Sequence, residues 1–177
     1  MKKSILFLLL IFSISVFAQS FSFGPQIGFL KTTDADNSKL SPSLAARLSL
    51  LNLTVESSIG YKEEEFEDGA IKTKSYPVNL TGMIGILPII NLEAGIGWHN
   101  TTIEYFKSLS SLSSITKSKP AYHLGVGAEL PLGNLIFTGD IRYVFIDLDL
   151  NHDLTLFNIP NIKSNYYVLL VGLMFKL

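Results

Sequence analysis

The chain has 177 residues, of which 47% are hydrophobic and 16% are charged, and its formal net charge at pH 7 is -1. This charge balance argues against a nucleic-acid partner, because nucleic-acid-binding proteins present a basic surface. The sequence has no cysteine, which excludes both a disulfide scaffold and a thiolate metal site.

Residues 1–18 have the pattern of a secretory signal peptide. Two lysines precede an apolar run over residues 5–17 that is too short to span a bilayer, and small residues stand at Ser15 and Ala18. We expect cleavage after Ala18, which leaves residues 19–177 as a single exported domain with about three negative charges in excess. A permanent anchor is the alternative, although no basic stop signal follows the run.

Beyond this segment, no apolar run is long enough for a membrane-spanning helix. The best candidate, residues 83–92, is interrupted by Pro88 and Asn91 and has about half of the twenty residues that a spanning helix needs. Apolar residues instead recur at every second position, which is the period of a β-strand. We therefore expect an all-β chain.

Eight segments show this alternation, with Pro25 expected to interrupt pairing in the first because proline lacks a backbone donor. The fifth could continue to Tyr105. In chain order the expected strands are residues 21–30, 43–50, 53–61, 76–86, 92–98, 122–130, 135–145 and 167–177.

Long and short connections alternate between these strands. The long ones cover residues 31–41, 62–74, 107–119 and 146–164, and the short ones are turns near residues 51–52, 87–88 and 131–134. This alternation predicts an eight-stranded antiparallel up-and-down transmembrane β-barrel with four long loops on one side. The first and last strands should pair and thereby remove the open edge of the sheet.

A soluble barrel of the lipocalin type would also show eight alternating strands, but with a charged exterior. In this chain the polar positions of the strands are mostly glycine, serine, threonine and alanine, and nearly all lysines lie in the long connections. A narrow membrane barrel needs such small inward residues. The pattern therefore favours an outer-membrane barrel over a soluble periplasmic carrier of an apolar ligand.

Aromatic residues collect at the ends of the expected strands, as in the interface girdles of membrane barrels. Phe21, Phe23, Phe137 and Phe175 stand at the short-turn ends. The expected girdle at the long-loop ends consists of Phe29, Tyr61, Tyr76, Trp98, Tyr122, Tyr143 and Tyr167.

Charged residues also fall on positions that face the expected lumen. A narrow lumen does not tolerate unpaired charge, so we expect these residues to pair across the barrel as a polar network that plugs it. A gated ion path through the same groups is the alternative. The residues are Arg47, Glu56, Glu93, Glu129, Asp140 and Arg142.

The sequence predicts no catalytic, cofactor-binding or metal-ligating residue, and we expect the protein not to be an enzyme. His99 and His123 should face the lumen, and His152 should lie in the last loop, but no serine forms a recognisable nucleophile arrangement with them. A lipid-modifying enzyme is therefore the weaker alternative. The acidic run at residues 63–68 matches no calcium-loop pattern, so we expect a solvated loop there.

Three features of the sequence belong together: the leader ending Val16-Phe17-Ala18-Gln19, the glycine-punctuated strands at residues 92–98 and 123–129, and the terminal strand. With these features the chain resembles the small outer-membrane barrels of the OmpX and OmpA membrane-domain type. The outward positions of the terminal strand are Tyr167, Leu169, Val171, Leu173, Phe175 and Leu177.

This resemblance implies a location in a Gram-negative outer membrane. It also implies insertion by the barrel-assembly machinery through a carboxyl-terminal signal in the last strand, which usually ends in phenylalanine, whereas this chain ends Phe175-Lys176-Leu177. The expected partners are therefore outer-membrane lipid and that machinery. A structural or surface-interaction role through the four loops is expected, with a loop ligand that the sequence does not identify.

Overall fold

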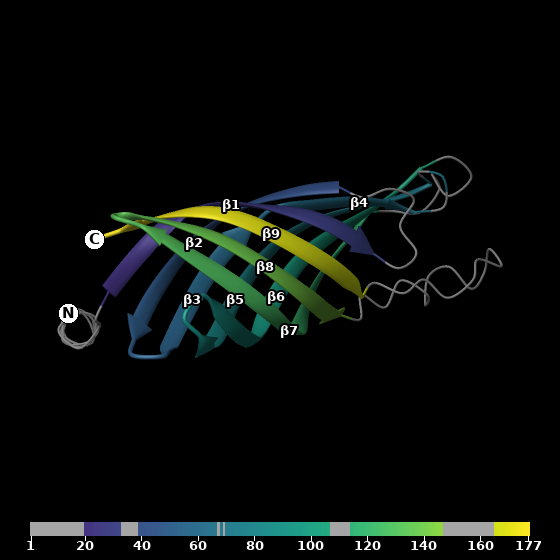
Figure 1. The fold of residues 1–177 in the computed structure, drawn as a ribbon. Helices are drawn as coiled ribbons and strands as arrows, with labels where there is room; N and C mark the ends of the chain where they lie inside the picture. The colour runs from purple at the N-terminus through teal and green to yellow at the C-terminus, as the bar shows by residue number, and fades with distance from the viewer. Residues whose placement is uncertain (1–19, 33–38, 67, 69, 107–113, 147–164) are drawn as a thin grey trace, which may run out of the picture.

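The computed structural model describes residues 20–32, 39–66, 68, 70–106, 114–146 and 165–177. In these ranges the strands form one antiparallel sheet that curves into a barrel (Figure 1). No helix in the described ranges is long and apolar enough to cross a membrane. The strands are β1 (Ser20–Thr32), β2 (Lys39–Leu50), β3 (Leu53–Gly60), β4 (Lys62–Phe66), β5 (Ile71–Leu87), β6 (Ile90–Tyr105), β7 (Ile115–Leu132), β8 (Leu135–Ile146) and β9 (Tyr166–Lys176).

The sheet closes on itself to form the barrel. β1 pairs with β9 from Ser22 opposite Lys176 to Thr32 opposite Tyr166, as predicted for the first and last strands. β3 and β4 both pair with β5 and are separated only at Tyr61, so together they serve as one strand of the barrel. The predicted eight-stranded antiparallel up-and-down barrel is therefore confirmed.

Local chemistry explains the irregular points of the sheet. The pairing between β1 and β9 omits Gly24 and Pro25, where proline has no N–H to donate. A two-residue turn at Gly133-Asn134 joins β7 to β8, and Gly133 adopts a φ of 64° that its missing side chain permits. The corresponding turn between β2 and β3 places Leu51 at a φ of 54°, a conformation that is strained for a residue with a side chain.

Two of the predicted long loops are wrong in extent. β4 pairs with the start of β5 from Lys62 opposite Ser75 to Phe66 opposite Ile71, so most of residues 62–74 is a hairpin and not a loop. β7 likewise begins at Ile115, within the segment 107–119 that the sequence predicted as a loop. Lysines, glutamates and serines in these strands gave them the composition of a loop.

Several sequence predictions concern residues that lie outside the described ranges. These are the signal peptide at residues 1–18, most of the first and fourth long loops, and His152.

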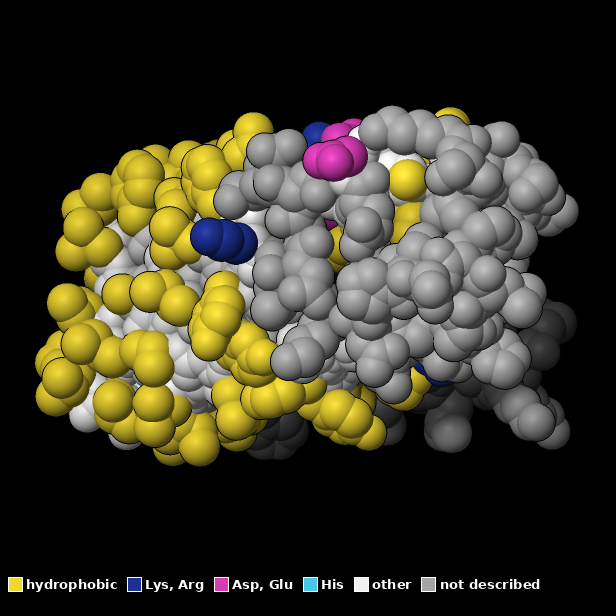
Figure 2. Space-filling model, turned by 90° about the vertical axis from the view of Figure 1, so that its right-hand side faces the viewer, with side chains coloured by type: hydrophobic (Ala, Val, Ile, Leu, Met, Phe, Trp, Pro, Cys, Tyr) yellow, Lys and Arg dark blue, Asp and Glu magenta, His cyan; other side chains and the backbone are white. Residues whose placement is uncertain are grey.

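The outer wall of the barrel is apolar. Leu44, Tyr122 and Ile141 are each about 60% exposed, which a water-facing surface would rarely allow for so many neighbouring apolar side chains. Figure 2 shows hydrophobic side chains spread over the visible wall, with few charged ones among them. The wall has the composition that a hydrocarbon environment requires.

The last strand is apolar on both faces. Tyr167, Leu169, Val171 and Phe175 point outward and are exposed, as predicted. The inward positions are also mostly apolar, although the sequence pattern predicted only one apolar face; they are Tyr166, Val168, Leu170, Gly172 and Met174.

Candidate functional site

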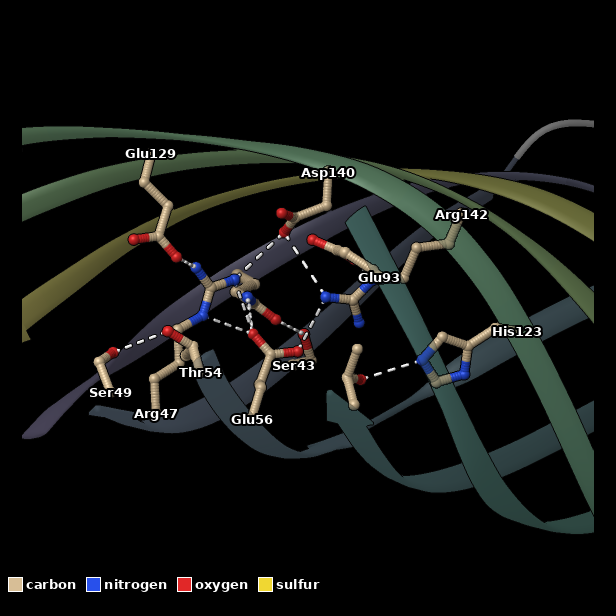
Figure 3. A network of polar contacts seen from close by, with 12 residues as sticks. Ser43, Arg47, Ser49, Thr54, Glu56, Glu93, His123, Glu129, Asp140 and Arg142 are labelled. Carbon is tan, nitrogen blue, oxygen red and sulfur yellow. Dashed lines mark hydrogen bonds and ion pairs between the residues drawn. The ribbon is translucent and has the colours of Figure 1, made fainter. Parts of the chain in front are cut away.

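The lumen of the barrel holds all six charged residues that the alternation of side chains along the strands assigned to it. We call these residues the charged layer. Figure 3 shows them converging from different strands of the barrel. Five are at most 3% exposed, whereas the side chain of Glu129 is 28% exposed. The members are Arg47, Glu56, Glu93, Glu129, Asp140 and Arg142.

Arg47 on β2 contacts three carboxylates. Its Nε donates to Glu56 Oε2 at 2.7 Å, and its Nη1 donates to Glu129 Oε1 at 2.6 Å. Its Nη2 lies 3.3 Å from Asp140 Oδ2. These partners come from β3, β7 and β8, so one guanidinium joins strands that are far apart in the sequence.

Arg142 on β8 organises the other half of the charged layer. Its Nε donates to Glu93 Oε2 at 2.6 Å, and its Nη2 donates to Glu56 Oε1 at 2.9 Å. The same Nη2 lies 3.7 Å from Asp140 Oδ2. Glu56 therefore binds both arginines, and Gln26 Nε2 donates a further hydrogen bond to it at 3.1 Å.

The two strand histidines, His99 and His123, face the lumen and are buried, as the alternation along their strands predicted. His123 Nε2 lies 3.0 Å from Thr81 Oγ1, while the ring of His99 packs edge-on against that of Tyr166 at 6.3 Å between centroids. A hydroxyl next to an imidazole is half of a nucleophilic triad. Both groups of the Thr81–His123 pair are nearly fully buried, so a substrate cannot reach them without opening the barrel.

An apolar cluster, which we call the apolar cap, fills the lumen towards the end of the barrel where β4 lies. The sequence-based prediction missed it, although Phe66, Ile71 and Ile103 each lie an even number of positions from the inward residues of their own strands and therefore on the same face. Its members are Leu30, Phe66, Ala70, Ile71, Ile103, Ala121, Val144, Ile146, Tyr166, Val168 and Leu170.

A buried ion pair lies beside the apolar cap. Lys62 Nζ is 2.6 Å from Glu64 Oε2, and both side chains are only 2% exposed. The same ammonium lies 3.8 Å from the centroid of the Tyr166 ring, a favourable cation–π position. Both charged residues belong to the segment that was expected from the sequence to be a solvated loop, so that expectation was wrong for them.

Charged side chains on the outer face of β4, β5 and β6 form pairs with one another. Lys72 Nζ lies 2.7 Å from Glu63 Oε1, and Lys74 Nζ lies 2.9 Å from Glu104 Oε1. The hydrogen bond from Lys72, together with one from the Tyr61 hydroxyl, lowers the pKa of Glu63. The same bond raises the pKa of Lys72.

Several of the predicted aromatic residues contact one another at the ends of the strands. The rings of Tyr61 and Tyr76 are 5.3 Å apart, and those of Tyr143 and Tyr167 are 4.5 Å apart. At the opposite end, the ring of Phe23 lies 6.1 Å from that of Phe175. The remaining members of the long-loop set are exposed on the outer wall; they are Phe29, Trp98 and Tyr122.

The described part of the lumen contains an inner pocket and an open one. One of about 50 Å³ lies between the charged layer and the apolar cap, lined by Arg142, His123 and Tyr166 among others. The other, of about 440 Å³, is open at the short-turn end and is lined in part by Met83, Asn91 and Glu129. The inner pocket is far smaller than the several hundred Å³ of a small-molecule site.

No family model matches the sequence, and no curated protein matches it. Solved structures do match the fold. Neisserial surface protein A (NspA) aligns with a TM-score of 0.59 at 12% identity, covering 89% of this chain and 97% of that one. A major outer membrane protein from Thermus thermophilus aligns with a TM-score of 0.60 at 14% identity, covering 89% and 99%.

A third similar structure is Ail, the attachment invasion locus protein of Yersinia pestis, solved in complex with the heparin analogue sucrose octasulfate. It aligns with a TM-score of 0.53 at 17% identity and covers 89% of this chain and 97% of that one. All three alignments span nearly the whole of the matched chain. The chain therefore has the fold of the small eight-stranded outer-membrane β-barrels.

Proposed function

We propose that the protein is an integral outer-membrane barrel with a plugged lumen and no enzymatic activity, and that it acts structurally or through its exposed loops. The observation that carries this proposal is the inverted distribution of side chains. Apolar residues such as Leu44 and Ile141 cover the outside, while Arg47, Glu56 and Arg142 lie buried within. Such a distribution is stable only when the outside faces hydrocarbon.

The plug has two parts on this account. The charged layer crosses the lumen with ion pairs between 2.6 and 3.7 Å long, and the apolar cap fills the lumen beyond it. An eight-stranded barrel leaves room only for side chains. Passage of a solute would require both parts to rearrange.

Location and insertion follow from the same features. A signal peptide at residues 1–18 would direct export, and the outward positions of β9 would serve as the insertion signal for the barrel-assembly machinery, with Leu177 in place of the usual phenylalanine. The aromatic residues, including Trp98 and Tyr167, would lie at the lipid headgroups.

A surface role would be carried by the end of the barrel where β4 lies. The Ail structure contains a heparin analogue, but three lysines at this end of the barrel are paired with carboxylates. Lys39, Lys72 and Lys74 each pair with a glutamate. The β4–β5 hairpin would therefore bind a partner that carries both positive and negative charges better than it would bind a polyanion.

Cell fractionation tests this proposal. The protein should stay in the outer-membrane fraction after washing with sodium carbonate and should leave it only with detergent. Recovery in the soluble periplasm would instead support the carrier alternative. Hydrolysis of lipid by the purified protein, lost in His99→Ala or His123→Ala, would instead support the enzyme alternative.

A further inference from the structure

Three buried oxygen atoms converge in the charged layer. A methyl group added to Gly127 would lie within 2.6 Å of Glu93 Oε1, Asp140 Oδ1 and Asn91 Oδ1, which places the three oxygens within about 5 Å of one another. The strand register explains the convergence. Asn91 on β6 and Asp140 on β8 stand directly opposite Gly127 on β7, and the missing side chain of the glycine leaves the space between them.

None of the three oxygens accepts a hydrogen bond from the described part of the chain. The arginines bind the other oxygen of each carboxylate, namely Glu93 Oε2 and Asp140 Oδ2. Asn91 is only 7% exposed, and Glu93 and Asp140 are still more buried. Three buried acceptors that face one another require a donor or a cation between them, because each unmet acceptor otherwise carries its full desolvation cost.

The charge balance of the layer points to the same need. Two arginines face four carboxylates, those of Glu56, Glu93, Glu129 and Asp140. Lys62, another buried cation of the described lumen, already pairs with Glu64. An excess of negative charge is costly in a closed lumen, where charges interact more strongly than in water.

We propose that Asn91, Glu93 and Asp140 bind a hard divalent cation, of the class of Ca²⁺ or Mg²⁺, in the lumen. Carboxylate and amide oxygens are the protein ligands that these ions prefer, with water completing their coordination. Asn91 and Glu129 also line the 440 Å³ pocket at the short-turn end, which provides a route from the periplasmic side. The ion would neutralise the charged layer and join β6 to β8.

Binding can be measured on protein refolded in an uncharged detergent, so that no anionic lipid competes for the ion. After treatment with EDTA, titration with CaCl₂ or MgCl₂ should give saturable heat in calorimetry and a raised thermal midpoint. NaCl at equal ionic strength should give neither. Asn91→Ala should raise the half-saturating concentration about tenfold or more.

Asn79→Ala is the matched control, because Asn79 also faces the lumen but lines the inner pocket beside His123. It should bind the ion as the unmodified protein does. If Asn91→Ala does not fold, Asn91→Asp tests the same site, since an added carboxylate should lower the half-saturating concentration.

Four results would overturn the proposal. They are no saturable binding, an equal effect of NaCl, binding that Asn91→Ala and Asn91→Asp leave unchanged, and a midpoint that responds to acidification but not to divalent ions. The third result would place the ion elsewhere, and the fourth would mean that Glu93 and Asp140 share a proton.

Discussion

Glu56 is the residue on which the two arginines of the charged layer both depend. It is fully buried and accepts from Arg47 at 2.7 Å and from Arg142 at 2.9 Å. Glu129 also binds Arg47, at 2.6 Å, but its side chain is 28% exposed at the edge of the layer. The two carboxylates thus differ in burial and in the number of arginines that they bind.

This difference gives a matched pair of substitutions. Glu56→Gln should lower the free energy of unfolding by about 3–5 kcal/mol, because it removes the fully buried carboxylate that binds both arginines. Glu129→Gln should cost about 1 kcal/mol or less, since water can replace the lost carboxylate. Urea unfolding of detergent-folded protein measures both values, and equal losses would contradict the central place of Glu56.

The positions of the six charged residues in the sequence were enough to predict that they face the lumen, because side chains alternate strictly along a strand. They could not show which residues pair. The Arg47–Glu56 pair joins directly opposed positions of β2 and β3, but the Arg47–Glu129 contact spans 82 residues and depends on the curvature of the closed barrel. The convergence on Gly127 likewise depends on the register of three strands.

At the scale of the strands, the polarity of the two faces inverts at the aromatic residues. Within the apolar wall, β5 points Val78 and Leu80 outward and Thr81 inward. Beyond Tyr76, the same strand points Lys72 and Lys74 outward and Ile71 inward. Lipid surrounds the first part on our account and water the second, so each part places its apolar side chains away from water.

Two isoleucines on opposite faces test this inversion. Ile103 is fully buried in the apolar cap, whereas Ile141 is 61% exposed on the outer wall. Ile103→Ala should lower the free energy of unfolding in detergent by about 2–5 kcal/mol, through lost burial and the cavity that it leaves. Ile141→Ala should cost clearly less because surrounding detergent fills the space, and the reverse order in urea unfolding would contradict the account.

The β4–β5 hairpin should depend on pH through Glu63. Its pKa is lowered by the hydrogen bonds from Lys72 and Tyr61, so the carboxylate stabilises the hairpin above its usual pKa range. That contribution should disappear as the pH falls through the lowered value. NMR titration of the Glu63 carboxyl carbon should show a midpoint below about 4.3.

Lys72→Met should move this midpoint back towards the ordinary value, because the largest cause of the shift is removed. Lys176→Met, at the other end of the barrel, should leave it unchanged. A Glu63 midpoint that Lys72→Met does not move would show that the pair does not form in solution.

The inversion also explains which strands could be predicted. In the part of the barrel with the apolar wall, alternation of apolar and small residues identified every strand, because lipid favours apolar side chains on the outer face. In the hairpin, burial alternates just as regularly from Lys62 to Phe66, but the sequence there is one lysine and three glutamates before Phe66, which is equally typical of a solvated loop. Composition was the stronger signal there, and it was misleading.

At the scale of the whole molecule, closure is what stabilises the barrel. β9 completes the ring against β1, and Leu177, which follows β9, also takes part, since its N–H donates to the Phe21 carbonyl at 2.9 Å. Apart from β4, every described strand pairs with at least two others. In hydrocarbon this pairing is essential, because unpaired backbone groups find no water there.

The central claim is a closed barrel whose apolar wall lies in a membrane, and gel mobility tests it most directly. The protein should be extracted from outer membranes with detergent and run on a denaturing gel with and without boiling. A closed barrel resists the denaturing detergent until heated, so the unboiled protein should migrate as a compact species and the boiled protein as an unfolded chain. Identical migration of the two samples would contradict the account.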